Sequence, residues 1–137
     1  RRYVFGDFNS AGADASGSVF FQITGGDDLL LGVGNGSLTN SINLTDGMVG
    51  YLGYWTHLAV TIDGTSGKIY RNGTLVKSDT FSISMAPGQN PICIGHYSVG
   101  ASGGEFNGSI SDVKMFDKAL NASEVTAQYN IGYNGIG

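Results

Sequence analysis

The sequence has little cysteine, little charge and no long hydrophobic run. Its single cysteine, Cys93, excludes an intrachain disulfide and with it a small scaffold stapled by disulfides. Only 7 Lys and Arg residues stand against 11 Asp and Glu, so no basic stripe is available for the phosphates of a nucleic acid. Apolar runs such as 29–31 are far shorter than the roughly 20 residues that cross a bilayer. We therefore expect neither nucleic-acid binding nor membrane insertion.

Charged side chains are few, and the chain is instead rich in glycine and in residues with hydroxyl or amide side chains. Charged residues make up 13% of the chain, 23 of its 137 residues are Gly, and 11% are aromatic. Typical domains carry about 25% charged residues. A chain with many aromatics and low net charge is not disordered, and it lacks the Ala, Glu, Lys and Leu stretches of helical bundles. We predict one all-β domain over residues 1–137.

Short apolar or alternating segments, separated by clusters of Gly, Asn, Asp and Ser, predict the strands. The segment 55–63 is the clearest, because apolar side chains fall on one face and more polar ones on the other. Asn72-Gly73, between two such segments, predicts a tight hairpin. The predicted strands are 3–8, 18–24, 29–33, 38–44, 55–63, 68–71, 74–81, 92–95 and 106–116.

One helix and one buried aromatic side chain complete this picture. Asn121 is a helix cap, and Glu124 stands three residues later, as in a capping box. The helix is expected to be short and to end near 130–132. Trp55 opens the clearest strand and is expected to anchor one end of a two-sheet core.

Two stretches resemble the central hairpin and the closing strand of laminin-G-like jelly rolls. The first is WTHLAVTIDG at 55–64 with GKIYRNG at 67–73, and the second is FNGSISDVKMF at 106–116 followed by the helix start at 119–125. These domains belong to the concanavalin A-like lectin and glucanase superfamily, which also contains the pentraxins. The resemblance covers 54–129 and implies a two-sheet antiparallel jelly-roll β-sandwich with one short C-terminal helix.

Scaffold roles follow from the same motifs. The closing strand of the family often reads Ile-Asp-Asp-Val after its glycine, and here Ser111 stands in place of the first acid. A metal role for this strand is therefore not expected. The residues expected to be structural are Trp55, His57, Asn72, Gly73, Gly108, Asp112, Asn121 and Glu124.

A difference from the family lies at the start of the chain, which begins at Arg1 without methionine. Family members usually begin with one or two further strands before the segment that 3–8 resembles. Unfilled strand positions would leave unpaired N–H and C=O groups on a sheet edge. We therefore expect an upstream segment or a neighbouring subunit to supply the missing edge.

No residue pattern supports catalysis. A glycosidase needs two carboxylates about 5–10 Å apart, and the glucanases of the superfamily place theirs on one strand as Glu-x-Asp-x-Glu. The two glutamates, Glu105 and Glu124, follow no such pattern. Cys93 lies between Ile92 and Ile94 and is expected to be an inert, buried thiol. We predict that the chain is not an enzyme.

Ligand-binding residues are expected in glycine-rich loops. Tyr51 and Tyr54 fall among glycines before the clearest strand, and His96 and Tyr97 lie in the glycine-rich segment 95–104. Aromatic rings beside amides and hydroxyls favour a sugar ligand. The alternative is that these tyrosines only cover the core.

Calcium is common in the superfamily, so the resemblance makes it a possible ligand. Asp7, Asp27 and Asp28 carry the hard oxygens that calcium prefers, and none of them forms the regular Asp-x-Asp-x-Asp loop. No other cofactor is expected.

Together these observations favour a non-catalytic recognition or adhesion module whose rim loops bind glycans or protein partners. The alternative is a structural assembly or decoration domain of a virion, a fibre or an extracellular filament. Either role implies an extracellular, cell-surface or virion-surface location.

Overall fold

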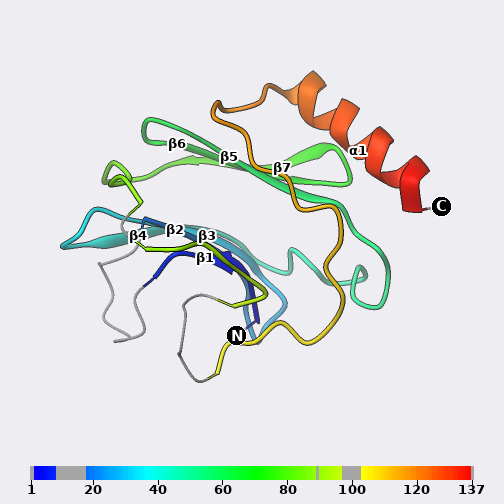
Figure 1. Cartoon of the computed structure of the whole chain (residues 1–137), viewed down its shortest axis with the longest axis horizontal. Helices are drawn as coiled ribbons and strands as arrows, with labels where there is room; N and C mark the ends of the chain where they lie inside the picture. Colours follow the sequence, from blue (N-terminus) through cyan, green and yellow to red (C-terminus); the bar gives the residue numbers. More distant parts are fainter. Residues whose placement is uncertain (1, 9–17, 89, 97–102, 137) are drawn as a thin grey trace.

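Two antiparallel sheets and one helix make up the fold. The computed structural model describes residues 2–8, 18–88, 90–96 and 103–136. The larger sheet has the order β4-β3-β2-β1-β8 and is made of β1 (Arg2–Gly6), β2 (Val19–Ile23), β3 (Leu29–Gly34), β4 (Thr39–Leu44) and β8 (Cys93–Ile94). The smaller sheet has the order β5-β6-β7 and is made of β5 (Leu58–Asp63), β6 (Ser66–Arg71) and β7 (Thr74–Thr80). The predicted antiparallel β-sandwich is confirmed (Figure 1).

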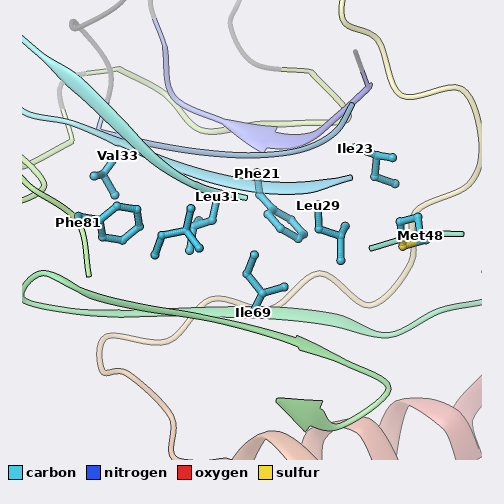
Figure 2. Close-up of a cluster of buried hydrophobic side chains, with 9 residues drawn as sticks. Phe21, Ile23, Leu29, Leu31, Val33, Met48, Ile69 and Phe81 are labelled. Carbon is cyan, nitrogen blue, oxygen red and sulfur yellow. The ribbon is translucent and has the colours of Figure 1, made fainter. Parts of the chain in front are cut away.

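The hydrophobic core lies between the two sheets. In β3 the side chains of Leu29, Leu31 and Val33 point inward and are fully buried, because residues at every second position of a strand share a face. Figure 2 shows them facing Ile69 of the smaller sheet. The buried core residues are Phe21, Ile23, Leu29, Leu31, Val33, Ile42, Met48, Ile69 and Phe81.

Two hairpins build the smaller sheet. A two-residue turn joins β5 to β6, and Asn72 and Gly73 join β6 to β7. Both residues of the second turn have positive φ, 49° for Asn72 and 77° for Gly73. This is the type I′ geometry that Asn-Gly favours between strands. The predicted hairpin is confirmed.

A helix, α1 (Ala122–Ile136), lies over one end of the smaller sheet, beside the β6–β7 turn (Figure 1). The Glu124 N–H donates to Asn121 Oδ1 at 2.9 Å, and the Asn121 N–H donates to Glu124 Oε2 at 2.9 Å. The predicted capping box is therefore confirmed, although the helix continues past the expected end at 130–132. The hydroxyl of Thr126 donates to the carbonyl oxygen of Gly73 at 3.1 Å and ties the helix to the β6–β7 turn. No helix in the described part of the chain is both long and apolar enough to span a membrane.

The strand predicted at 106–116 is wrong. The structure has no strand there, and residues 111–119 are all exposed. A strand needs a hydrogen-bonded neighbour, and the last backbone bond before the helix joins the Phe106 N–H to the Gly95 oxygen at 2.8 Å. Asp112 also has a φ of 54°, which breaks an extended backbone.

The predicted burial of Trp55 is wrong as well. The side chain is 57% exposed, and β5 begins only at Leu58. Met48, 4% exposed, instead closes this end of the core (Figure 2). A long, unbranched side chain fills such irregular space well.

The predicted buried strand at 92–95 is shorter and more exposed than expected. Only Cys93 and Ile94 pair with β1, and Ile92 and Ile94 are 45% and 44% exposed. The thiol of Cys93 is half-buried and not buried. The reason is that β8 is the edge strand of the larger sheet and has a neighbour on one side only.

Candidate functional site

A turn between β4 and β5 carries two exposed aromatic side chains, Tyr54 and Trp55. We call residues 47–55 the aromatic turn. Its base is fixed, because Met48 is buried in the core and its N–H donates to the carbonyl oxygen of Asp27 at 2.8 Å. A Cβ at Gly47 would lie 3.0 Å from the Leu44 oxygen, so a larger residue would push the turn off the core.

Two glycines then direct the chain outward. Gly50 and Gly53 have φ values of 81° and 84°, which other residues rarely adopt. The Tyr54 N–H donates to the Tyr51 oxygen at 3.3 Å, and the hydroxyl of Thr56 donates to the Tyr54 oxygen at 3.2 Å. The turn is therefore held by its own backbone and by its neighbours.

Tyr51 supports the turn from below. The Arg71 guanidinium carbon lies 3.9 Å from the centroid of the Tyr51 ring, which is a cation–π geometry. Arg71 Nη1 also donates to the Gly47 oxygen. Tyr51 is half-buried and packs against the core cluster. For this tyrosine the geometry favours the covering role, because Arg71 occupies one face of the ring.

Tyr54 and Trp55 present their rings to solvent at the top of the turn. Tyr54 is 77% exposed and Trp55 is 57% exposed. Leu52 and Val49 are exposed beside them in sequence, at 39% and 56%. Large apolar side chains clustered on a fixed loop are typical of a binding surface. Sequence reasoning missed Trp55 as a candidate binding residue because its place before an alternating strand indicated burial.

His96 lies at the same end of the sandwich as the aromatic turn. Register aligns Arg2, Ile23, Leu29 and Leu44 at this end, and the Gly95 N–H donates to the Val4 oxygen there. The structure thus places three predicted ligand residues, Tyr51, Tyr54 and His96, at the same end of the sandwich. The aromatic turn follows β4 and His96 follows β8, which are the two edge strands of the larger sheet. Tyr97 lies outside the described residues.

Glu105 carries a negative charge near His96. The backbone N–H groups of Glu105 itself and of Gly103 lower the pKa of this carboxyl, and the nearby His96 lowers it further. The Gly103 N–H donates to Glu105 Oε1 at 3.1 Å. A carboxylate held by backbone amides can accept further hydrogen bonds.

The predicted calcium ligands contact donors of the protein itself. Asp7 is buried, and its Oδ1 accepts the N–H groups of Ser18 and Val19 at 2.7 and 2.9 Å. Asp27 pairs with Arg2 at 3.0 Å. Asp28, predicted with them, accepts a backbone N–H at 2.9 Å.

These carboxylates therefore hold strands and turns. Among the residues that the structure describes, no three His, Cys, Asp or Glu side chains are grouped to hold a metal ion. Calcium binding by Asp7, Asp27 and Asp28 stays a prediction.

His57 belongs to the scaffold below the helix. Its N–H donates to Asn72 Oδ1 at 2.9 Å, and the Asn72 N–H donates to the His57 oxygen at 2.8 Å. The ring lies 5.7 Å from that of Tyr129 on α1. Burial lowers the pKa of His57, and the positive charge of Lys114 lowers it further. Both effects favour the neutral form of the imidazole between the sheet and the helix.

Comparisons with known proteins found a similar solved structure and a matching family model. A solved structure of an S-layer domain-containing protein from Clostridium thermocellum ATCC 27405 is similar, with 21% sequence identity and a TM-score of 0.48. The match covers 90% of this chain and 60% of that chain. No curated protein matches. A family model, Laminin_G_3 of the concanavalin A-like lectin/glucanases superfamily, matches residues 2–126. The chain therefore belongs to this laminin-G-like family of the concanavalin A-like lectin/glucanases superfamily.

Proposed function

We propose that this chain is a non-catalytic recognition module of a surface or extracellular protein, and that the aromatic turn binds a glycan. The observation that carries the proposal is the exposure of Tyr54 and Trp55 on a turn that is fixed from below. Aromatic rings bury the apolar faces of sugar rings, and fixed rings lose little conformational entropy on binding. Amide and backbone groups of the rim supply hydrogen bonds to hydroxyls.

A binding role fits the carboxylates better than hydrolysis does. Glu105 follows β8, whereas Glu124 caps α1 and bonds Lys118 Nζ at 2.7 Å. Each accepts a hydrogen bond from a nearby donor, and the two lie on separate segments. A glycosidase requires two carboxyl groups that face one bond. We therefore assign the module no catalytic step.

The lone tryptophan gives a direct test. Trp55 is the only indole in the chain, so its fluorescence reports on any ligand that covers it. Titration with a panel of glycans should quench the emission or shift it to the blue. For a glycan that binds, Tyr54→Ala should weaken affinity about tenfold, which is ~1.4 kcal/mol.

A matched control comes from the opposite end of the sandwich. Leu38 is 60% exposed in the β3–β4 turn, and Leu38→Ala should leave affinity unchanged. If no glycan in the panel changes the emission of the folded protein, sugar recognition is wrong and a protein ligand takes its place. If Tyr54→Ala and Leu38→Ala weakened glycan affinity equally, the aromatic turn would not be the binding site.

A role in assembly is the second candidate, and a different surface favours it. Val113, Met115 and Phe116 are 52%, 56% and 49% exposed in one short segment. An apolar surface of this kind suits contact with another polypeptide. Light scattering over a range of concentrations tests the assembly role, because an assembly domain should form defined oligomers or filaments. A monomer at all concentrations counts against it.

A further inference from the structure

Asparagine is followed by glycine at four places in the chain, Asn35, Asn72, Asn107 and Asn134. At such a pair the asparagine side chain can react with its own backbone, because glycine has no Cβ to hinder the approach of its nitrogen. The reaction also requires that the side chain is free to turn and that the glycine N–H is not held elsewhere. The four pairs differ in these two respects.

The reaction is deamidation, and it needs no reagent except solvent water. The glycine nitrogen attacks the side-chain carbonyl carbon, Cγ, of the asparagine and closes a five-membered imide ring. The amide nitrogen leaves as ammonia and takes up the proton of the glycine N–H. Water then adds to one of the two imide carbonyls and opens the ring to aspartate or to isoaspartate. Either product carries a carboxylate at neutral pH where the asparagine was uncharged.

Asn72-Gly73 is locked in the turn between β6 and β7. Asn72 Oδ1 accepts the His57 N–H at 2.9 Å, and the Asn72 N–H donates to the His57 oxygen at 2.8 Å. The ring of Tyr129 covers the glycine, since a Cβ at Gly73 would lie 2.9 Å from Tyr129 Cδ1. The Asn72 side chain therefore cannot turn toward the Gly73 nitrogen without breaking contacts of the fold.

Asn35-Gly36 lies in the exposed turn between β3 and β4, but its side chain is engaged. Asn35 Oδ1 accepts the N–H groups of Ser37 and Leu38 at 3.0 and 2.8 Å. The Asn35 N–H donates to the Leu38 oxygen at 3.1 Å. This Asx turn fixes the amide against the backbone of its own loop.

Asn134-Gly135 lies within α1. Backbone N–H groups inside a helix donate to the carbonyl oxygens of the preceding turn, so the glycine nitrogen is held there. Three of the four pairs are thus restrained by the structure around them.

Asn107-Gly108 has no such restraint. Both residues are exposed, and they lie between β8 and α1 in a segment without helix or strand. Neither residue forms a hydrogen bond within the part of the chain that the structure describes. The Asn107 side chain and the Gly108 nitrogen are therefore both accessible to each other and to water.

The glycine of this pair has a packing role. A Cβ at Gly108 would lie 3.0 Å from Phe106 Cε1, and Phe106 packs against the core cluster. A larger residue at this position would push the ring away from the core. The packing that requires glycine at 108 therefore also leaves Asn107 beside the most reactive neighbour it could have.

We propose that Asn107 is a site of spontaneous deamidation, whereas Asn35 and Asn72 stay intact in the folded chain. The new carboxylate stands two residues after Glu105. It also follows Phe106, whose N–H donates to the Gly95 oxygen at 2.8 Å. The reaction therefore adds negative charge to a segment that already carries the Glu105 carboxylate. This inference does not depend on glycan binding.

Incubation of folded Arg1–Gly137 at mildly alkaline pH, followed by a short tryptic digestion and mass spectrometry, tests the proposal. Trypsin cleaves after Lys and Arg, so Asn35, Asn72 and Asn107 fall in the separate peptides 3–68, 72–77 and 78–114. Deamidation appears as the mass gain from an amide to a carboxyl group, and fragmentation of each peptide places it. Asn107 should react at least about tenfold faster than Asn72, which is ~1.4 kcal/mol in activation free energy.

Two controls separate the effect of structure from that of local sequence. In guanidinium chloride the contacts of Asn35 and Asn72 are lost, so the three peptides should deamidate at similar rates. Asn107→Gln keeps the amide but requires a six-membered ring, which closes more slowly. This substitution should remove the rapid conversion from the peptide 78–114 and leave the other two peptides as they were.

Three results would overturn the proposal. One is conversion of Asn35 or Asn72 in the folded chain as fast as that of Asn107. Another is a lead of Asn107 that persists in the unfolded chain, because local sequence would then account for it. The third is rapid conversion in 78–114 that survives Asn107→Gln. The comparison of folded and unfolded Arg1–Gly137 decides the question even if Asn107→Gln does not fold.

Discussion

Strands β3 and β5 both carry large apolar residues at every second position, and these residues reach different depths of burial. Leu29, Leu31 and Val33 of β3 are 0% exposed, whereas Leu58 and its inward neighbours in β5 are only half-buried. β3 lies between β2 and β4, while β5 is the last strand of its sheet. Alternation therefore determines which face of a strand points inward, and the neighbouring strands determine how completely that face leaves water.

The largest expected loss of stability comes from a leucine-to-alanine substitution, which we compare between the two strands. Leu31→Ala removes a fully buried side chain and should lower the free energy of unfolding by about 2–5 kcal/mol. Leu58→Ala removes a half-buried one and should cost about 1 kcal/mol. Urea unfolding followed by circular dichroism measures both losses. Equal losses would mean that the edge of β5 is as well covered as the centre of β3.

A smaller loss of stability is expected from a substitution on the outer face of the larger sheet, where Gly32 lies under the Phe20 ring. A Cβ at Gly32 would overlap that ring. The ring is itself held by edge contacts to Tyr3 and Phe8, with centroids 5.8 and 5.0 Å away. Gly32→Ala should therefore cost about 1–3 kcal/mol.

Gly25→Ala is the matched control for that substitution. A Cβ at Gly25 would meet nothing within 4 Å, so the change should leave stability the same or raise it by up to about 1 kcal/mol. Thermal unfolding of the two variants side by side makes the comparison. A harmless Gly32→Ala would show that the aromatic ring moves aside freely.

The parts of the fold that the sequence predicts well are those set by local chemistry. Asn72-Gly73 makes its turn because both residues tolerate positive φ. Asn121 and Glu124 form their capping box because each can reach a free N–H of the helix start. Neither feature depends on what lies elsewhere in the chain.

The parts that the sequence predicts badly depend on distant neighbours. The segment 106–116 has a strand pattern, but a strand forms only beside another one. Trp55 precedes a true strand, but Met48 is buried at this end of the core and the indole is exposed. A pattern of residues does not reveal whether the partner position is occupied.

In the candidate site too, local sequence predicted some features, whereas others depend on residues far apart in the chain. Glycines around Tyr54 predicted an accessible turn, and its exposure agrees with that prediction. The contact between Arg71 and Tyr51 joins two separate elements, and nothing in the local sequence indicated it. Asp27 and Asp28 were predicted as metal candidates from their residue type alone, whereas their partners depend on how β1 and β4 approach them.

The smallest expected effect concerns the space between the smaller sheet and α1, where His57 lies beside Tyr129 with Lys114 nearby. Burial and then the charge of Lys114 lower the pKa of His57 below its ordinary value of 6.5. Below pH 6.5 the unfolded chain binds a proton at this residue more readily than the folded chain. The contribution of His57 to the stability of the fold is thus fully present above pH 6.5 and is lost as the pH falls through the folded pKa.

The melting temperature should therefore decrease on acidification from pH 7.5 to pH 5. His57→Gln should flatten this part of the profile, whereas His96→Gln, outside the helix contact, should leave the His57 part in place. If His57→Gln left the dependence of melting temperature on pH unchanged, the imidazole would be as accessible to water as the edge of β5.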